Sequence, residues 1–215
     1  DWVKDELTDE DDNVVNDIGA IFLTGKAGTG KSTAIKYLKH LFQKTAVIAP
    51  TNIAAMNVKG STIHSFFGLP PTVMDPSEIT RIDALKLPIL QNLDLLIIDE
   101  VSMVTSAMVD CIDVSLRLAK GNGKPFGGIK MLFVGDLFQL PPVVDDTEVM
   151  KYFSGVKERY DTPMFLSADV FKKEKGNCIM YPLELNVIKR QDGTKSEEDA
   201  KFIQALNAIR TNNLS

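Results

Sequence analysis

The sequence has few of the residues that form disulfide cross-links or bind structural zinc. Its 215 residues include two histidines and two cysteines, Cys111 and Cys178, without CxxC or Cys/His metal-ligand spacing. A disulfide framework and a structural zinc site are therefore not expected, and a reducing compartment fits best. No apolar run approaches the roughly 20 residues that cross a bilayer, so we expect no membrane partner.

The chain also has no excess of positive charge, with 24 Lys and Arg against 29 Asp and Glu. The formal net charge is -5, which argues against a generally basic, nucleic-acid-coating surface, although a local groove can still bind phosphates. Much of the negative charge lies in residues 1–19, which we expect to form a solvated acidic segment. Because the sequence begins at Asp1 and has no initiator Met, we expect a processed or cut chain. A bacterial cytoplasm is favoured over a nucleus or mitochondrion.

What the sequence does have is an alternation of apolar runs and amphipathic stretches. The runs predict strands at residues 20–24, 45–49, 93–99, 129–134 and 177–185. Their continuous apolar character is typical of parallel strands that are covered on both faces. The pattern therefore predicts an α/β fold with a mostly parallel sheet and helices on both faces.

Helical periodicity separates some of these runs. One predicted helix face comprises Ile35, Leu38, Leu41 and Phe42, and a second comprises Val109, Ile112 and Leu116. We expect the second helix to end at Gly121. The stretch 68–92 contains four prolines and is the best candidate for an insertion between core elements.

The most specific motif is GKAGTGKS at residues 25–32, which satisfies GxxxxGK[ST] between a predicted strand and a predicted helix. Glycines let the backbone approach phosphate, and the N–H groups at the helix start face the anion. Lys31 would reach the β- and γ-phosphates, and the Ser32 hydroxyl would take a Mg²⁺ coordination place. The residues expected to bind the nucleotide are Gly28, Thr29, Gly30, Lys31, Ser32 and Thr33.

A carboxylate pair follows the apolar run LLII. Asp99 ends the predicted strand where ligands gather in open α/β sheets, and Glu100 comes next. We assign Asp99 to the metal and Glu100 to the attacking water, as a base. Without the phosphate loop, the same pair would be an ordinary solvated strand end.

Other classes of phosphate-loop protein have characteristic sequence motifs that do not occur here. No NKxD string reads guanine, and no SGGQ-type signature marks a transporter ATPase. The motifs present are GKAGTGKST (25–33), APTNIAAMNVKGSTIHSFFG (49–68), IIDEVSMV (97–104), PFGG (125–128), GDLFQLPPV (135–143) and ELNVIKRQ (184–191). Together they resemble the petite-integration-frequency (PIF) family of superfamily-one, 5′-to-3′ DNA helicases related to RecD.

The resemblance implies the N-terminal motor domain of an ATP-dependent DNA helicase. Residues 20–192 would form a RecA-like, ATP-binding domain, and residues 193–215 a helix that leads toward a second RecA-like domain absent here. The implied cofactors are ATP and Mg²⁺, and the implied partners are single-stranded DNA and duplex junctions. The protein is expected to be a monomer, and this fragment weakly active or inactive alone.

The resemblance also assigns residues to DNA and to the γ-phosphate. Thr51, Asn52, His64 and Ser65 are expected to lie under single-stranded DNA. Phe66 or Phe67 could stack a base, although at least one of them is favoured as core. Arg190 and Gln139 would approach the γ-phosphate, with Asp136 holding the loop that follows the strand 129–134.

The sequence departs from the family pattern at three places. No Gln precedes Gln43 to read adenine, Asn52 stands where Gly is usual, and NVIKRQ lacks the usual aromatic before Arg190. Two other functions stay open: an ATP-dependent binding module or switch without translocation, and a RecD-like subunit of a nuclease complex.

Overall fold

The computed structural model of the chain describes residues 19–71, 74–146 and 159–186. The strands are β1 (Ala20–Gly25), β2 (Thr45–Ala49), β3 (Ser61–Thr62), β4 (Leu95–Ile98), β5 (Lys130–Val134) and β6 (Met180–Leu185). The α-helices are α2 (Lys31–Leu41), α3 (Asn52–Asn57), α4 (Ile63–Phe67), α5 (Leu87–Gln91) and α6 (Ser106–Lys120). Short 3₁₀ helices lie at Pro76–Glu78, Val101–Met103, Pro125–Gly128, Phe165–Ser167 and Asp169–Phe171.

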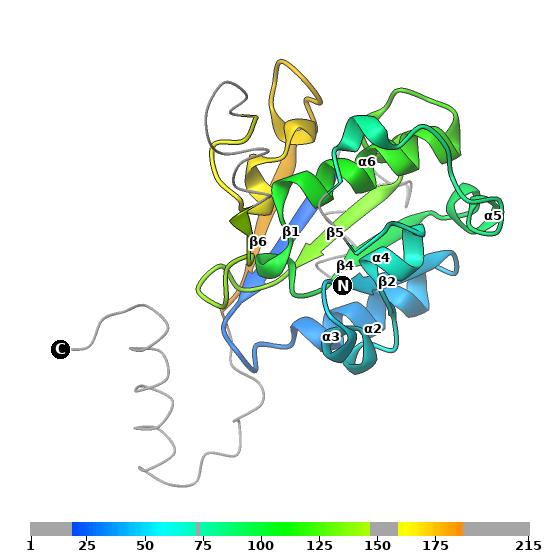
Figure 1. The fold of residues 1–215 in the computed structure, drawn as a ribbon. Helices are drawn as coiled ribbons and strands as arrows, with labels where there is room; N and C mark the ends of the chain where they lie inside the picture. The colour runs from blue at the N-terminus through cyan, green and yellow to red at the C-terminus, as the bar shows by residue number, and fades with distance from the viewer. Residues whose placement is uncertain (1–18, 72–73, 147–158, 187–215) are drawn as a thin grey trace, which may run out of the picture.

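The strands form one parallel sheet in the order β3-β2-β4-β5-β1-β6. The five predicted strands are confirmed, although those at 93–99, 129–134 and 177–185 are shorter than predicted. The sixth, β3, is too short to carry a periodic signal. Because all strands run in one direction, the carboxyl ends of β1 and β5 meet at the same edge of the sheet (Figure 1).

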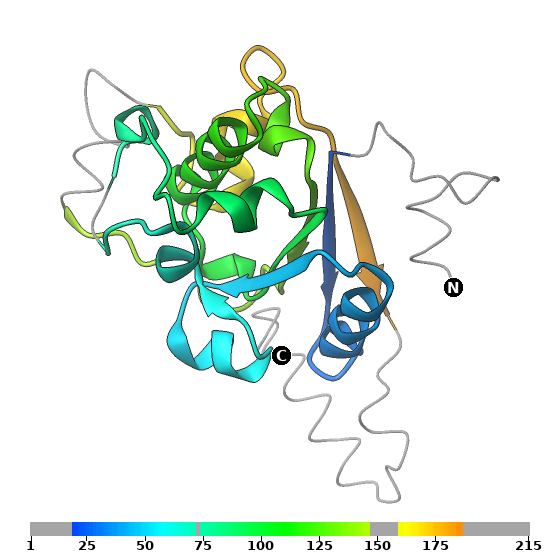
Figure 2. The same cartoon turned by 90° about the vertical axis from the view of Figure 1, so that its right-hand side faces the viewer.

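Two cores cover the two faces of the sheet. Along β1, Ala20 and Phe22 belong to the larger cluster with α6, whereas Ile21 and Leu23 belong to a cluster with α2. Figure 2 shows α2 and α6 on different sides of the twisted sheet. Helices on both faces are therefore confirmed, and the continuous apolar runs follow from burial on both sides.

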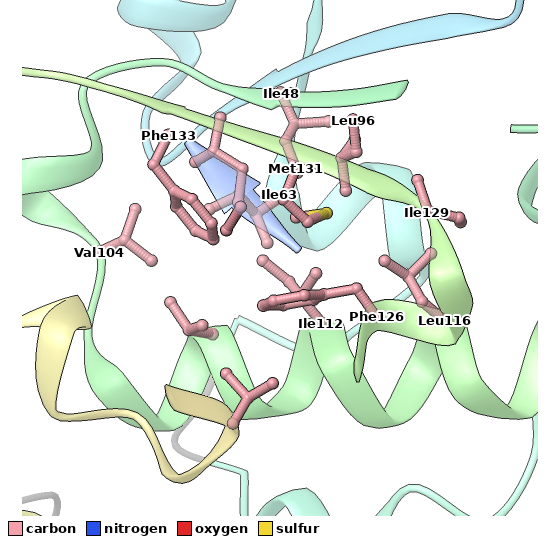
Figure 3. Close-up of a cluster of buried hydrophobic side chains, with 14 of the residues drawn as sticks. Ile48, Ile63, Leu96, Val104, Ile112, Leu116, Phe126, Ile129, Met131 and Phe133 are labelled. Carbon is pink, nitrogen blue, oxygen red and sulfur yellow. The ribbon is translucent and has the colours of Figure 1, made fainter. Parts of the chain in front are cut away.

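The larger core lies between the sheet and α6 (Figure 3). Ile112 and Leu116 of α6 are fully buried there, facing Phe126 and Phe133. As predicted, α6 ends at Gly121, which adopts a left-handed conformation with φ 65°. Full burial of each large apolar side chain stabilises the fold by roughly 1.5–3 kcal/mol. This packing fixes the position of α6 against the sheet, and with it the positions of the loops at both ends of the helix.

Two predictions about burial are wrong. Leu41 is 39% exposed, because it lies about 120° around α2 from the buried Ile35, whereas Phe42 follows the helix and packs against the smaller core. The strand β6 is an edge strand whose residues are half-buried or exposed. That edge position explains how Pro182 fits, since it needs no ladder hydrogen bond on the open side.

Several predictions lie outside the described residues. They are the acidic segment before residue 19, the helix at 193–215 and the position of Arg190. The division into segments 1–19, 20–192 and 193–215 therefore stays a prediction. Within the described part of the chain, no helix is both long and apolar enough to cross a membrane.

Candidate functional site

The phosphate loop joins β1 to α2 in a conformation that requires glycine. Gly25, Gly28 and Gly30 have positive φ angles of 152°, 81° and 101°. Nothing lies within 4 Å of a Cβ placed on Gly30, so its backbone conformation, not crowding, demands glycine there. Gly30 is also the N-cap of α2 and has no side chain to cover the first N–H groups. These donors at the start of an 11-residue helix are suited to an anion.

Two side chains hold this loop together. Thr29 is buried, and its hydroxyl donates to the carbonyl of Lys26 at 2.8 Å. The Lys31 ammonium donates to the carbonyls of Gly25 at 2.5 Å and Lys26 at 3.2 Å. The side chain of Thr29 therefore stabilises the loop, and its binding to the nucleotide stays a prediction. Its backbone N–H also bonds to Lys26, at 3.3 Å.

The carboxylate pair lies at the end of β4, beside the same loop. Asp99 is half-buried, and loss of solvent raises the pKa of its carboxyl to about 6, helped by the charge of Glu100. The positive charge of Lys31 and a backbone hydrogen bond from Glu100 act the other way and lower that pKa. The fold therefore brings Lys31 and Asp99, 68 positions apart in sequence, within electrostatic reach of each other.

Glu100 has a backbone conformation that its side chain disfavours. Its φ of 52° and ψ of 43° place it in the left-handed region, directly before the 3₁₀ helix Val101–Met103. A non-glycine residue in this region costs roughly 1–2 kcal/mol, and such strain is concentrated at functional sites. The sequence gives no signal for it, because glycine is the usual marker of this conformation.

The oxygen donors at this edge fit a magnesium ion. Asp99 supplies a carboxylate that is short of solvent, and Ser32 supplies an exposed hydroxyl at the start of α2. Hard oxygen ligands of this kind, few in number and completed by water and phosphate, are typical of Mg²⁺ sites. Ser32 and Asp99 would hold the ion, which neutralises charge on the phosphates when bound.

The raised pKa predicts how nucleotide binding depends on pH. Ionised Asp99 is the form that takes a metal, so below about pH 6 a proton competes with Mg²⁺. We expect the affinity for the Mg²⁺–ADP complex to fall about fivefold on lowering the pH from 6 to 5, since the ionised fraction of Asp99 then falls from about one half to about one tenth. Fluorescence titration measures this. In the Asp99→Asn variant the affinity should be low and lose that part of the pH dependence; an unaltered dependence in this variant would contradict the assignment.

The loop that follows β5 contacts both β1, which leads into the phosphate loop, and the turn after Glu100. The Gly135 N–H donates to the Leu23 carbonyl of β1 at 3.2 Å, and a Cβ on Gly135 would lie 3.0 Å from the Val101 side chain. Asp136 is fully buried, and its carboxylate accepts from the Phe138 N–H at 3.1 Å. The prediction that Asp136 holds this loop is therefore confirmed. Gln139 is exposed on the loop, so its proposed role at the γ-phosphate stays a prediction.

The expected DNA-contacting residues flank β3 at the same edge. Thr51 is the N-cap of α3, and its hydroxyl accepts from the Ala54 N–H at 3.2 Å. Asn52 and Ser65 are exposed, and His64 is half-buried, which lowers the pKa of its imidazole. Three of the four residues therefore present polar groups to solvent, whereas Thr51 uses its hydroxyl within the fold. That use was detectable from its position before the apolar helix.

The phenylalanine pair is divided between core and surface layer. Phe67 is 3% exposed in the larger core, and Phe66 is partly buried against it. Their rings form an edge-to-face pair with centroids 5.2 Å apart. The prediction that at least one of them is core is confirmed.

This arrangement combines a phosphate loop, a carboxylate pair and a polar patch at one sheet edge. The profile of the PIF1-like helicases matches residues 6–215. The chain belongs to the PIF1-like helicase family. It is 36% identical over 203 residues to the ATP-dependent DNA helicase PIF1 of Saccharomyces cerevisiae, covering 90% of this chain and 21% of that protein.

A human relative and a solved structure also support membership of the PIF1-like family. It is 30% identical over 215 residues to the human ATP-dependent DNA helicase PIF1, covering 96% of this chain and 30% of that protein. A crystal structure of the Pif1 helicase from Bacteroides in complex with ADP-AlF3 and ssDNA superposes with a TM-score of 0.79 at 38% identity. The overlap covers 93% of this chain and 44% of that one. The expected RecA-like fold is confirmed, and the chain spans less than a third of these two curated relatives.

A network of hydrogen bonds and ion pairs around Asp110 of α6 and Arg159, which the sequence analysis did not predict, stabilises this PIF1-like domain. The buried Asp110 of α6 accepts hydrogen bonds from the Tyr160 hydroxyl at 2.8 Å and from the N–H groups of Asp169 and Val170, each at 3.0 Å. Arg159 pairs with Asp169 at 3.0 Å and with Asp75 at 3.1 Å. The network ties the stretch 68–92 and the segment after residue 159 to α6. No sequence signal reveals it, because its members are up to 95 positions apart.

Proposed function

We propose that this chain is the ATP-binding motor domain of a DNA helicase that translocates on single-stranded DNA in the 5′-to-3′ direction. The observation that carries the proposal is the convergence of Lys31 and Asp99 at the carboxyl edge of the sheet. The polar residues around β3 lie along the same edge, so nucleotide and DNA would bind to neighbouring loops. A phosphate-loop domain built in this way can couple the two ligands through the loops they share.

The residues divide the chemistry of ATP hydrolysis among themselves. The loop 28–33 binds phosphates through its N–H groups, and Lys31 places its charge near the β- and γ-phosphates. Glu100 accepts a proton from the attacking water, and Asp99 and Ser32 hold the metal. Gln139 orients water or reads the γ-phosphate, and the buried Asp136 keeps that loop in place.

Completion of the site requires groups beyond the described residues. Arg190 is the proposed cation at the γ-phosphate, five positions after Leu185, which pairs with Gly25 in the sheet. A second RecA-like domain would supply further arginines and the other wall of the DNA track. Loss of one such arginine costs about 10³ to 10⁵ in rate, which supports a low activity for this domain alone. Duplex junctions as substrates and a monomeric state belong to the same proposal.

The cellular compartment also stays a prediction. Relatives of the chain come from yeast, human and the bacterium Psychrobacter, so they favour neither the bacterial cytoplasm nor a nucleus or mitochondrion.

Binding of single-stranded DNA tests the motor against an ATP-dependent switch. We expect the chain to bind a fluorescent single strand, and His64→Ala together with Asn52→Ala to weaken that binding about tenfold, the loss of one or two hydrogen bonds. Anisotropy titration measures the dissociation constant. Unchanged binding in this double variant, or no binding by the parent chain, would favour the switch.

Thr51 needs a different substitution in the same experiment. Thr51→Ala removes the N-cap of α3 and costs about 1 kcal/mol of stability, which would blur an effect on DNA. Thr51→Ser keeps the capping hydroxyl and removes only the methyl group. Lys36→Ala, on the exposed face of α2, is the matched control that should leave DNA binding unchanged.

A further inference from the structure

A pocket of about 290 Å³ lies at the carboxyl edge of the sheet, between α4 and the start of α6. Its walls come from three segments of the proposed machinery. His64 belongs to the expected DNA track and Pro50 directly precedes Thr51 of that track. Met103 follows Glu100 by three positions, and Val143 follows Gln139 by four. Neither the phosphate loop nor Asp99 lines the pocket, so it is separate from the nucleotide site.

The chemistry of the walls suits a flat, uncharged group. Met74, Met103 and Met108 all line the pocket, together with three prolines. Methionine adapts its shape and makes favourable contacts with aromatic rings through sulfur. No lysine or arginine is among the described lining residues, and the one charged lining residue among them is the acidic, exposed Asp145. A phosphate is therefore a poor occupant.

His64, one of the lining residues, can still form hydrogen bonds with an occupant. His64 is half-buried, and this burial lowers the pKa of its imidazole below the ordinary value, so the ring is neutral near pH 7. A neutral imidazole donates one hydrogen bond and accepts one, as the edge of a base requires. The exposed Ser65 is the next residue along α4 and can contact the sugar-phosphate backbone outside.

We propose that this pocket receives one unstacked base of the bound single strand. The proposal rests on the proposed function, because the strand must follow Thr51, Asn52 and His64 for a base to reach the pocket. Apolar walls on both sides of a base and a polar edge are the usual features of a base-binding pocket. Continuity with the DNA track and the lack of lining cations favour a base over a phosphate or an acidic peptide.

The position of the pocket gives the bound base a part in coupling. Met103 and Val143 follow the two loops that carry Glu100 and Gln139, and Gly135 packs one loop against the other. A shift of either loop on nucleotide binding or hydrolysis therefore changes the width of the pocket.

Scanning a single abasic residue along a short oligothymidylate tests the proposal, because an abasic residue keeps the phosphate and removes the base. With the parent chain, we expect an abasic residue at one position to raise the dissociation constant about 5- to 150-fold, the range for loss of one stacked base. Met108→Ala removes part of a wall and keeps α6, since alanine is the best helix former. In this variant the penalty at that position should shrink to less than about threefold.

Matched variants separate the pocket from general damage. Leu140→Ala changes a residue of the β5 loop that is 71% exposed and does not line the pocket, and it should keep the full abasic penalty. Met108→Leu retains the apolar volume and should also keep it. The slope of log affinity against log salt should be the same for Met108→Ala and the parent, because no phosphate contact is lost.

Each contrary outcome has its own meaning. If Met108→Ala leaves the abasic penalty intact, or weakens normal and abasic strands equally, the pocket does not hold a base and the inference is wrong. If abasic residues have no effect on a strand that the parent binds well, the pocket is open to another occupant, such as an apolar protein side chain, and the inference is again wrong. If the parent binds no single strand at all, the proposed function fails along with it.

Discussion

Replacing Lys31 by alanine is expected to weaken binding of the Mg²⁺–ADP complex about 10- to 150-fold. The ammonium now bonds to the carbonyls of Gly25 and Lys26 at 2.5 and 3.2 Å, so it is held inside the loop that wraps the phosphates. A hydrogen bond to a charged group contributes about 1.5–3 kcal/mol, which corresponds to this range of affinity. Titration with a fluorescent nucleotide measures the dissociation constants.

The pH of that experiment matters. The charge of Lys31 lowers the pKa of Asp99, so its removal moves that pKa further above 6. Measurement near pH 8 keeps Asp99 ionised in both proteins and isolates the contact with phosphate. Lys36→Ala, five positions further along α2 and exposed, is the control that should bind as the parent does. If the affinity of Lys31→Ala for Mg²⁺–ADP stays within about threefold of the parent, the proposed contact between Lys31 of the phosphate loop and the nucleotide is wrong.

Glu100→Gln is expected to slow ATP hydrolysis by about 10² to 10⁴ while leaving nucleotide affinity within about threefold. Glutamine has the shape of the parent residue and can keep the left-handed backbone, with its φ of 52°, but it cannot accept a proton from water. Single-turnover hydrolysis with the chain in excess over ATP measures the chemical step without product release.

A second signature accompanies this variant. The charge of Glu100 raises the pKa of Asp99, so its removal should lower that pKa and shift the pH dependence of Mg²⁺–nucleotide binding toward acid. Asp94→Asn is the matched control, because Asp94 is exposed at the opposite end of β4 and should change neither property. Hydrolysis by Glu100→Gln at the parent rate would show that another group activates the water.

Local sequence patterns were sufficient for the elements of this fold. The apolar runs fixed the positions of β1, β2, β4 and β5, because burial on both faces leaves no room for polar residues. The weaker predictions were at the margins. The strand β6 was predicted to be covered on both faces, but it is an edge strand with Pro182 and exposed side chains. Leu41 was predicted to lie on the buried face of α2, but it is exposed about 120° around the helix from Ile35.

The candidate site was predictable only in part. GKAGTGKS and the Asp-Glu pair after LLII predicted the phosphate loop and the acids, because those residue types are required wherever a backbone wraps phosphate and a carboxylate holds its metal. The side-chain functions of Thr29 and Thr51 within the fold, and the left-handed Glu100, depend on which neighbours come close. A motif specifies residue types and does not specify these contacts.

By itself, then, the sequence determined the α/β class, the phosphate loop, the acids at the end of β4 and the membership of the PIF1-like helicases. Those features are local, since each depends on residues within a few positions of one another. Tertiary structure alone decided that Lys31 lies near Asp99, that the β5 loop packs on the turn after Glu100 through Gly135, and that Pro50, Met103 and Val143 share one pocket. The reason is physical: parallel strands bring their carboxyl ends to one edge, and only the order of strands in the sheet determines which loops become neighbours there.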